Sequence, residues 1–125
     1  RYAETLLAYA ELVGVEGVAE QKGISAQQCL DMVRDRAFGD TNHRVAVNKQ
    51  NIINENHYEF VGEGHRFSDL RRWGVAVQYL NNRQEKDFTG EIRFTRKFTE
   101  RDYLWPIPSE EIQRNPALKP NNPGW

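Results

Sequence analysis

Apolar residues recur at intervals of three and four through the first eighty positions, the spacing that gathers them on one face of an α-helix. The pattern predicts four amphipathic helices, over residues 1–13, 26–38, 47–61 and 65–80. Short polar or glycine-containing loops separate them, which favours helices packed as antiparallel pairs. Alanines on the first helix permit the close approach of a neighbouring helix, as in helical hairpins and solenoids.

Helix-end signals support these boundaries. Ser25 and Gln28 have the spacing of a capping box at the start of the second helix, and Gly39 follows its last turn. Gly62 and Gly64 separate the third helix from the fourth. Glycine readily adopts the positive φ that a helix C-terminus commonly needs, so this pair predicts a break in the chain's helical course.

The pattern changes after residue 80. Residues 81–90 are polar and predict a loop. Apolar and polar residues then alternate over residues 92–98, which indicates a half-exposed strand or an extended arm. Pro106 and Pro108 follow, and each proline holds the residue before it in an extended conformation, so this stretch cannot be helical.

The predicted fold is therefore mostly α. A helical part, residues 1–80, carries an extended, loop-rich segment, residues 81–125, packed on it within a single domain. Ser109 is expected to cap one short helix over residues 110–115 in that segment.

Composition narrows the class of protein. The chain has 125 residues, of which 38% are hydrophobic and 28% charged, as in one soluble globular domain. Its net charge of −1 gives no electrostatic basis for binding nucleic acid or an anionic membrane. A single cysteine excludes a disulfide within the chain. Because Arg1 already lies in a predicted helix, we expect the chain to be the C-terminal part of a longer protein.

The densest group of charged and aromatic residues lies on either side of the glycine break. Glu59 and Glu63 are one helical turn apart, and two carboxylates at such a separation can act as nucleophile and acid in a retaining glycosidase. One of them would have to stay protonated, whereas the nearby arginines favour ionisation of both. We favour a structural interpretation, in which these carboxylates pair with Arg66, Arg71 or Arg72.

Three further residues, Asp69, His57 and Cys29, also receive structural interpretations. Asp69 is expected to pair with partly buried arginines, so that its loss would destabilise the fold. His57 is expected at the edge of the core, and Cys29 as an inert thiol on the buried face of the second helix. The histidine spacing does not match a metal site, and we expect no catalytic residue, metal or cofactor.

Aromatic residues are the candidates for binding a sugar, because aromatic faces stack on the apolar faces of sugar rings. Trp73 and Trp125 occupy positions that predict packing in the core, which leaves Trp105 and the tyrosines. Residues 81–101 carry the least pattern of any segment and supply the candidate ligand contacts, which are Asn81, Asn82, Arg83, Phe88 and Arg93.

Several blocks of the sequence resemble the SusD/RagB family. Residues 1–11 are similar to its helix R-x-A-E-x-x-L-x-x-A-E-A, and residues 33–37 to its V-R-x-R-A. Residues 59–74 are similar to E-L-A-F-E-G-H-R-W-F-D-L-R-R-W-G. The signature residues of that block are Glu59, Glu63, Gly64, Arg66, Asp69, Arg71, Arg72 and Trp73.

The remaining blocks lie near the end of the chain. Residues 104–112 resemble L-x-P-I-P-x-x-E-I. Residues 115–116 and 122–125 resemble the closing N-P … Q-N-P-G-Y. The blocks occur in the family's order and span nearly the whole chain, which makes the set specific although each block alone is weak.

The resemblance implies a mostly helical fold with tetratricopeptide-like helix pairs. It also implies a surface lipoprotein of a Bacteroidetes-type bacterium, which binds a glycan or another nutrient over a SusC-like TonB-dependent transporter. Its place would be the extracellular face of the outer membrane, held by an N-terminal lipid anchor that this chain does not contain. The family's ligand contacts lie largely upstream of the matching region. The alternative hypothesis is a helical-repeat scaffold that binds only protein.

Overall fold

The computed structural model describes residues 1–125 and divides into two compact units, Arg1–Arg66 and Phe67–Trp125. Six α-helices, two short 3-10 helices and one two-stranded sheet make up the regular structure, which confirms the mostly α fold. The sequence predicted a different division, into residues 1–80 and 81–125, which was based on the change in secondary structure. That division stays a prediction. None of the helices is both long enough and apolar enough to cross a membrane.

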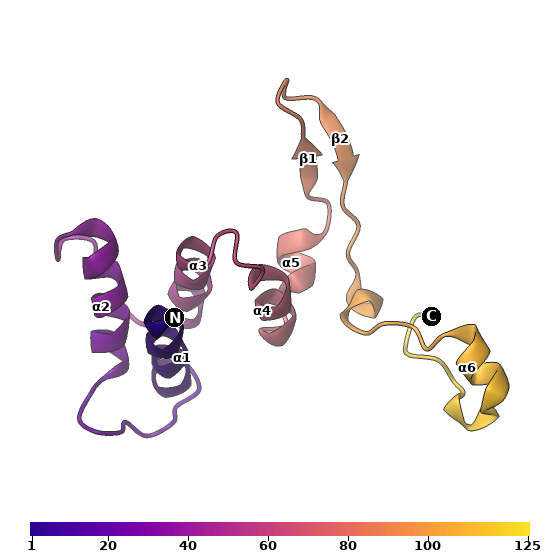
Figure 1. The fold of residues 1–125 in the computed structure, drawn as a ribbon, viewed down its shortest axis with the longest axis horizontal. Helices are drawn as coiled ribbons and strands as arrows, with labels where there is room; N and C mark the ends of the chain where they lie inside the picture. The colour runs from indigo at the N-terminus through magenta and orange to yellow at the C-terminus, as the bar shows by residue number, and fades with distance from the viewer. The chain divides into compact units, whose positions relative to one another are not determined.

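The first unit consists of three helices, α1 (Tyr2–Gly14), α2 (Ala26–Phe38) and α3 (Lys49–Glu59). Helix α1 packs against both α2 and α3 (Figure 1). The third helix is shorter at both ends than the predicted range 47–61. Its start is fixed by Asn48, whose side chain accepts a hydrogen bond from the backbone N–H of Asn51. The core of this unit is aliphatic and consists mainly of Leu6, Leu7, Ala10, Cys29, Leu30, Val33, Ile52 and Ile53.

The predicted capping box of α2 is confirmed. The backbone N–H of Gln28 donates to Ser25 Oγ over 3.1 Å, and the backbone N–H of Ser25 donates to Gln28 Oε1 over 2.8 Å. Gly39 ends the helix in the left-handed conformation, with φ of 75°. The box and the glycine thus fix both ends of α2 from local sequence alone.

The second unit is built around a small core on α4 (Arg66–Arg72) and α5 (Ala76–Leu80). Leu70, Ala76, Leu80 and Phe98 are buried there, and Tyr103 packs against Phe98 edge to face. A single helix over residues 65–80 was predicted, and this is wrong. Gly74 adopts a φ of 70°, which a right-handed helix does not accommodate, so the chain stops and starts again.

The rest of the second unit is extended or turned. Strands β1 (Gln84–Lys86) and β2 (Ile92–Thr95) form an antiparallel hairpin, so part of the predicted loop is a strand. The short elements η1 (Glu100–Tyr103), α6 (Ser109–Arg114) and η2 (Pro116–Leu118) follow. Ser109 is the first residue of α6 and Pro108 takes the cap position, so the predicted Ser109 cap is wrong.

A buried ion pair joins α2 to α3. Arg34 Nη1 lies 2.5 Å from Glu55 Oε2, and the two side chains are 13% and 5% exposed. Arg34 Nε also donates to the carbonyl of His43, and its guanidinium lies 5.2 Å from the centre of the Phe38 ring. One side chain therefore contacts α3, the loop after α2 and the end of α2 itself.

Replacing Glu55 by alanine should destabilise the protein strongly, because it leaves the Arg34 charge buried without its carboxylate. We expect a loss of about 3–5 kcal/mol in the free energy of unfolding, measured by denaturant titration of the full-length protein. Asp35→Ala is the matched control, since Asp35 is the next residue of α2 and its partner Arg44 is 45% exposed. An equal loss in both variants would contradict the assignment of Glu55 as a buried anchor.

Candidate functional site

The two glutamates considered as a catalytic pair lie in an arginine cluster of the first unit. Arg1 Nη2 is 2.7 Å from Glu63 Oε1 and donates over 2.8 Å to the backbone carbonyl of Glu59. It is also 3.1 Å from Glu59 Oε1, an ion pair whose angle is too poor for a hydrogen bond. Arg36 pairs with Glu59 Oε2. The interpretation from sequence named Arg66, Arg71 or Arg72 as the partners and missed Arg1 and Arg36, which lie far away along the chain.

Arg66 and Gly64, the other signature residues of the first unit, shape the end of α3. Arg66 Nη1 donates to the carbonyl of Ile53 over 3.2 Å. Gly62 and Gly64 both have positive φ, at 81° and 80°, as the predicted break requires. The region is a structural corner that ion pairs and carbonyl contacts hold in place.

The signature residues of the second unit also make structural contacts. Arg71 donates to the carbonyl of Tyr103, and Trp73 is buried as predicted. Asp69 lies 3.4 Å from Arg72, whose side chain is 52% exposed. The expectation that Asp69 pairs with partly buried arginine is therefore wrong for Arg72, and an exposed pair of this kind contributes only about 0–1 kcal/mol.

The structure places His57 and Cys29 differently with respect to the core. His57 is exposed, so its predicted position at the core edge is wrong. The buried stripe of α3 runs instead through Ile52, Glu55 and the largely covered side chain of Glu59. Cys29 is buried as predicted, and burial raises the pKa of its thiol, which keeps it protonated and unreactive. No group of three or more potential ligand side chains could hold a metal ion.

The predicted ligand residues all lie on or beside the β1–β2 hairpin. At its base, Asn81 Oδ1 accepts a hydrogen bond from the backbone N–H of Phe98 over 3.3 Å. Asn82 has a φ of 57°, a left-handed conformation that asparagine tolerates better than most residues. Arg83 is exposed, and its carbonyl accepts from the backbone N–H of Arg96. Asn81 and Asn82 therefore shape the chain where it enters the hairpin.

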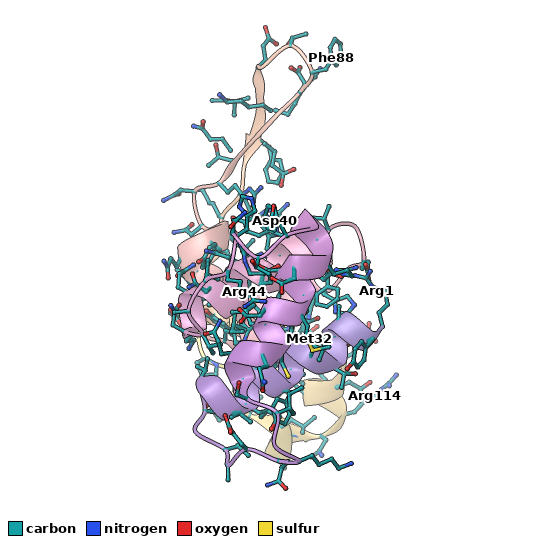
Figure 2. The ribbon with its side chains drawn as sticks, turned by 90° about the vertical axis from the view of Figure 1, so that its left-hand side faces the viewer. Arg1, Met32, Asp40, Arg44, Phe88 and Arg114 are labelled. Atoms are coloured by element: carbon teal, nitrogen blue, oxygen red, sulfur yellow. The ribbon has the colours of Figure 1, made fainter.

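Asp87 organises the tip of the hairpin. Its Oδ1 accepts from the backbone N–H and the hydroxyl of Thr89, over 2.8 and 2.6 Å, and from the backbone N–H of Glu91 over 3.1 Å. Its Oδ2 accepts from Arg93 Nε over 2.9 Å. Phe88 lies at the tip of the hairpin, as Figure 2 shows. Its surface is 98% exposed. Arg93 thus braces the turn, while Phe88 is presented to the surroundings.

A second group of aromatic residues, most of them exposed, surrounds a hollow of about 200 Å³ within the second unit. Its lining combines aromatic and aliphatic side chains with one cation and one carboxylate. These residues are Phe67, Lys97, Phe98, Asp102, Leu104, Trp105 and Trp125. Sequence reasoning did not find this group, because its members are spread over almost sixty positions.

Two asparagines hold the segment that carries Trp105. Asn121 Oδ1 accepts from the backbone N–H of Ile107 over 2.8 Å, and Asn121 Nδ2 donates to the Ile107 carbonyl over 3.1 Å. Asn122 Nδ2 donates to the carbonyl of Trp105 over 2.5 Å. The two side chains replace the missing partner strand of an extended segment, and Trp105 remains 77% exposed.

Trp125 is fixed at its polar end and open elsewhere. Its indole N–H lies 3.1 Å from the Arg101 carbonyl and 3.0 Å from the Leu104 carbonyl, and it donates to both. The Arg101 guanidinium lies 4.4 Å from the ring centre. The prediction that Trp125 lies in the core is wrong, because 46% of its surface is exposed.

Comparison with known proteins identifies the family of the chain. A sequence profile of the SusD family matches residues 1–125. The chain belongs to the SusD family. It is 30% identical over 121 residues to the SusD-like protein P25 of Formosa agariphila. The match covers 90% of this chain and 22% of that protein.

Solved structures of SusD-family proteins resemble the fold. Surface glycan-binding protein A from Bacteroides fluxus is 43% identical with a TM-score of 0.73, and the match covers all of this chain and 26% of that one. Surface glycan-binding protein A from Bacteroides thetaiotaomicron, in complex with laminarihexaose, is 34% identical with a TM-score of 0.69, over 98% of this chain and 24% of that one. The chain thus spans about a quarter of the length of these proteins.

The SusD-family blocks of this chain coincide with its long-range contacts. The first and third blocks meet where Arg1 contacts Glu59 and Glu63. The last two blocks meet where Asn122 binds the Trp105 carbonyl. Part of the family signature in this chain therefore joins segments far apart in the sequence.

The hairpin tip should depend on pH through Asp87. Hydrogen bonds from Thr89, chiefly from its hydroxyl, lower the pKa of the Asp87 carboxyl below its usual value of 3.8. A lowered folded-state pKa stabilises the turn at neutral pH, and this stabilisation is lost as the pH falls below 3.8 and through the folded-state pKa. We expect the amide proton of Gly90 to exchange slowly at neutral pH and to lose protection in acid. In Asp87→Asn its protection should be weak and independent of pH, and equal protection in both proteins would contradict this role.

Gly124 should be indispensable for the placement of Trp125. Its φ is 87°, and a Cβ atom at this position would lie 2.6 Å from Arg101 Cβ. Gly124→Ala should therefore displace the indole, which we expect to see as loss of hydrogen-exchange protection at the Trp125 indole N–H. Gly90→Ala is the control, since Gly90 has a φ of 88° but open space where its Cβ would lie. Unchanged protection in Gly124→Ala would overturn the steric argument.

Proposed function

We propose that the SusD-family protein to which this chain belongs binds a glycan at the cell surface and passes it to a SusC-like TonB-dependent transporter. The match of the family profile over residues 1–125 carries the proposal. It is supported by the relative, 34% identical, that was solved in complex with laminarihexaose. The protein resides on the extracellular face of the outer membrane, where an N-terminal lipid anchor holds it.

The protein binds its ligand without cleaving it. Glu59 and Glu63, the two carboxylates closest to a glycosidase arrangement, face Arg1 within ion-pair distance, and Arg36 covers the other oxygen of Glu59. Hydrolysis requires one carboxyl group that donates a proton to the leaving group. Both carboxylates are instead engaged by arginine, which leaves neither group free to face a leaving group.

The β1–β2 hairpin contributes ligand contacts through the predicted residues that the fold leaves exposed. Asn81 holds the backbone of Phe98, and Arg93 holds Asp87, so both have structural tasks. Phe88 and Arg83 are exposed and offer an aromatic face and a multiple hydrogen-bond donor. Asn82, exposed beside Arg83, completes this group.

One observation favours the alternative, a scaffold that binds only protein. The first unit has a groove of about 400 Å³, lined mainly by apolar side chains that include Tyr2, Leu6, Met32 and Val33. Tyr2 and Met32 are 67% and 43% exposed, and exposed apolar surface of this kind is common in protein interfaces. A scaffold of this kind would bind a partner protein and retain no glycan.

Electrophoresis of the full-length protein in native gels that contain polysaccharide tests the proposal. We expect retarded migration in at least one gel of a panel that includes laminarin, xylan, starch and mannan. We also expect no release of reducing sugar from the retarding polysaccharide on prolonged incubation, because arginines engage the Glu59 and Glu63 carboxylates.

The outcomes separate the hypotheses. Retardation on none of the polysaccharides, with capture of a TonB-dependent transporter in a pull-down, would favour the scaffold. Release of reducing sugar that disappears in Glu59→Gln or Glu63→Gln would reject a non-catalytic role.

A further inference from the structure

The hollow around Trp105 and Trp125 has features that packing alone does not explain. Trp105 is 77% exposed, although burial of a large apolar side chain is favourable. Leu104, beside it, is 52% exposed. Such surface in one hollow indicates a binding position for a ligand with an apolar face.

The hollow also carries polar groups that match hydroxyls. Asp102 has a lowered pKa, because the backbone N–H and then the hydroxyl of Thr99 bind it, so it is ionised at neutral pH and acts only as an acceptor. Both bonds from Thr99 reach Oδ2, over 2.7 and 2.8 Å, whereas Oδ1 lies 3.6 Å from Arg101 Nε. Lys97 supplies an exposed ammonium donor on the same lining. A sugar hydroxyl can donate to Asp102 while another accepts from Lys97.

The backbone of Trp105 and the indole of Trp125 are each held by hydrogen bonds. The Trp105 backbone accepts from Asn122, and the Trp125 indole donates to two carbonyls with Arg101 against its ring. A ligand that binds here does not have to order this backbone or the Trp125 indole, which lowers the entropic cost of binding.

We infer that this hollow is a sugar-binding subsite, which takes one pyranose ring of a glycan against the face of Trp105 and binds its hydroxyls through Asp102 and Lys97. The inference rests on the proposed glycan-binding function and adds a site to it. The volume of about 200 Å³ suits a single ring, since pockets for whole drug-sized ligands occupy about 300–1,000 Å³. A longer glycan extends from the subsite over the surrounding surface.

Titration calorimetry of the full-length protein with laminarihexaose tests the subsite. Trp105→Ala should weaken binding about tenfold, or about 1.4 kcal/mol, with an unchanged melting temperature because the side chain is exposed. Trp105→Phe keeps a smaller aromatic face, so its affinity should lie between those of wild type and Trp105→Ala. Tyr58→Ala is the control, since Tyr58 is 65% exposed on α3 and should leave the affinity unchanged. If another polysaccharide of the gel panel is the one that retards the protein, its oligosaccharide replaces laminarihexaose.

The outcomes separate the subsite from the proposed function. Equal affinity in wild type and Trp105→Ala would overturn the subsite and leave glycan binding intact. A fall in melting temperature without a change in affinity would also overturn it, and would show that another part of the full-length protein covers Trp105. Wild-type protein that binds no glycan of the panel would overturn both.

Discussion

The arrangement of helices in the first unit depends on the contacts of the Arg34 guanidinium. Its three helices have only 11 to 13 residues each, so the core between them is small. Arg34 adds a buried charge pair with Glu55, a bond to the His43 carbonyl and a contact with Phe38. Five N–H donors in a fixed fork allow one side chain to hold several segments. The pair contributes little net stability compared with an apolar contact. The loss of either partner strongly lowers the free energy of unfolding, so the pair specifies one arrangement of α2 and α3.

The second unit is held by polar contacts to backbone carbonyls. Arg71 binds the carbonyl of Tyr103, Asn121 binds both backbone groups of Ile107, and Asn122 binds the Trp105 carbonyl. An extended segment without a neighbouring strand must satisfy its N–H and C=O groups in another way. Side-chain amides do this here, because each carries both a donor and an acceptor. The closing segment therefore acts as a partner for the segment before α6.

Local signals in the sequence predicted both ends of α2 correctly. The capping box at Ser25 and the stop at Gly39 depend on neighbouring residues alone, and both are present. The break at Gly74 was missed because the apolar spacing of Leu70, Trp73 and Leu80 continues across it. The spacing of apolar residues indicates which side chains are buried. Two short helices that pack on one core can have the same spacing as one long helix. A positive φ at a glycine leaves no trace in such a pattern.

The charge partners were harder to predict, because pairing depends on tertiary structure. Glu59 and Glu63 were assigned arginines close in sequence, whereas Arg1 reaches both from the start of α1. For the same reason the hollow beside Trp105 was not found, since its lining comes from α4, η1, the two loops that flank η1, and the end of the chain. The resemblance to the SusD family named the right blocks without explaining them. Their physical role became clear only once the contacts between distant blocks were known.

The closing block combines a structural task with the presentation of aromatic surface. Gly124 gives the chain a turn that no other residue fits beside Arg101, and this turn brings the Trp125 indole to two carbonyls. A tryptophan whose only task is packing gains most when its whole ring is covered. Here the polar end is satisfied while nearly half of the surface is exposed, as it is, more strongly, for Trp105. The hydrogen bonds to two carbonyls and the contact with Arg101 fix the Trp125 ring, so a partner that stacks on it does not have to order it.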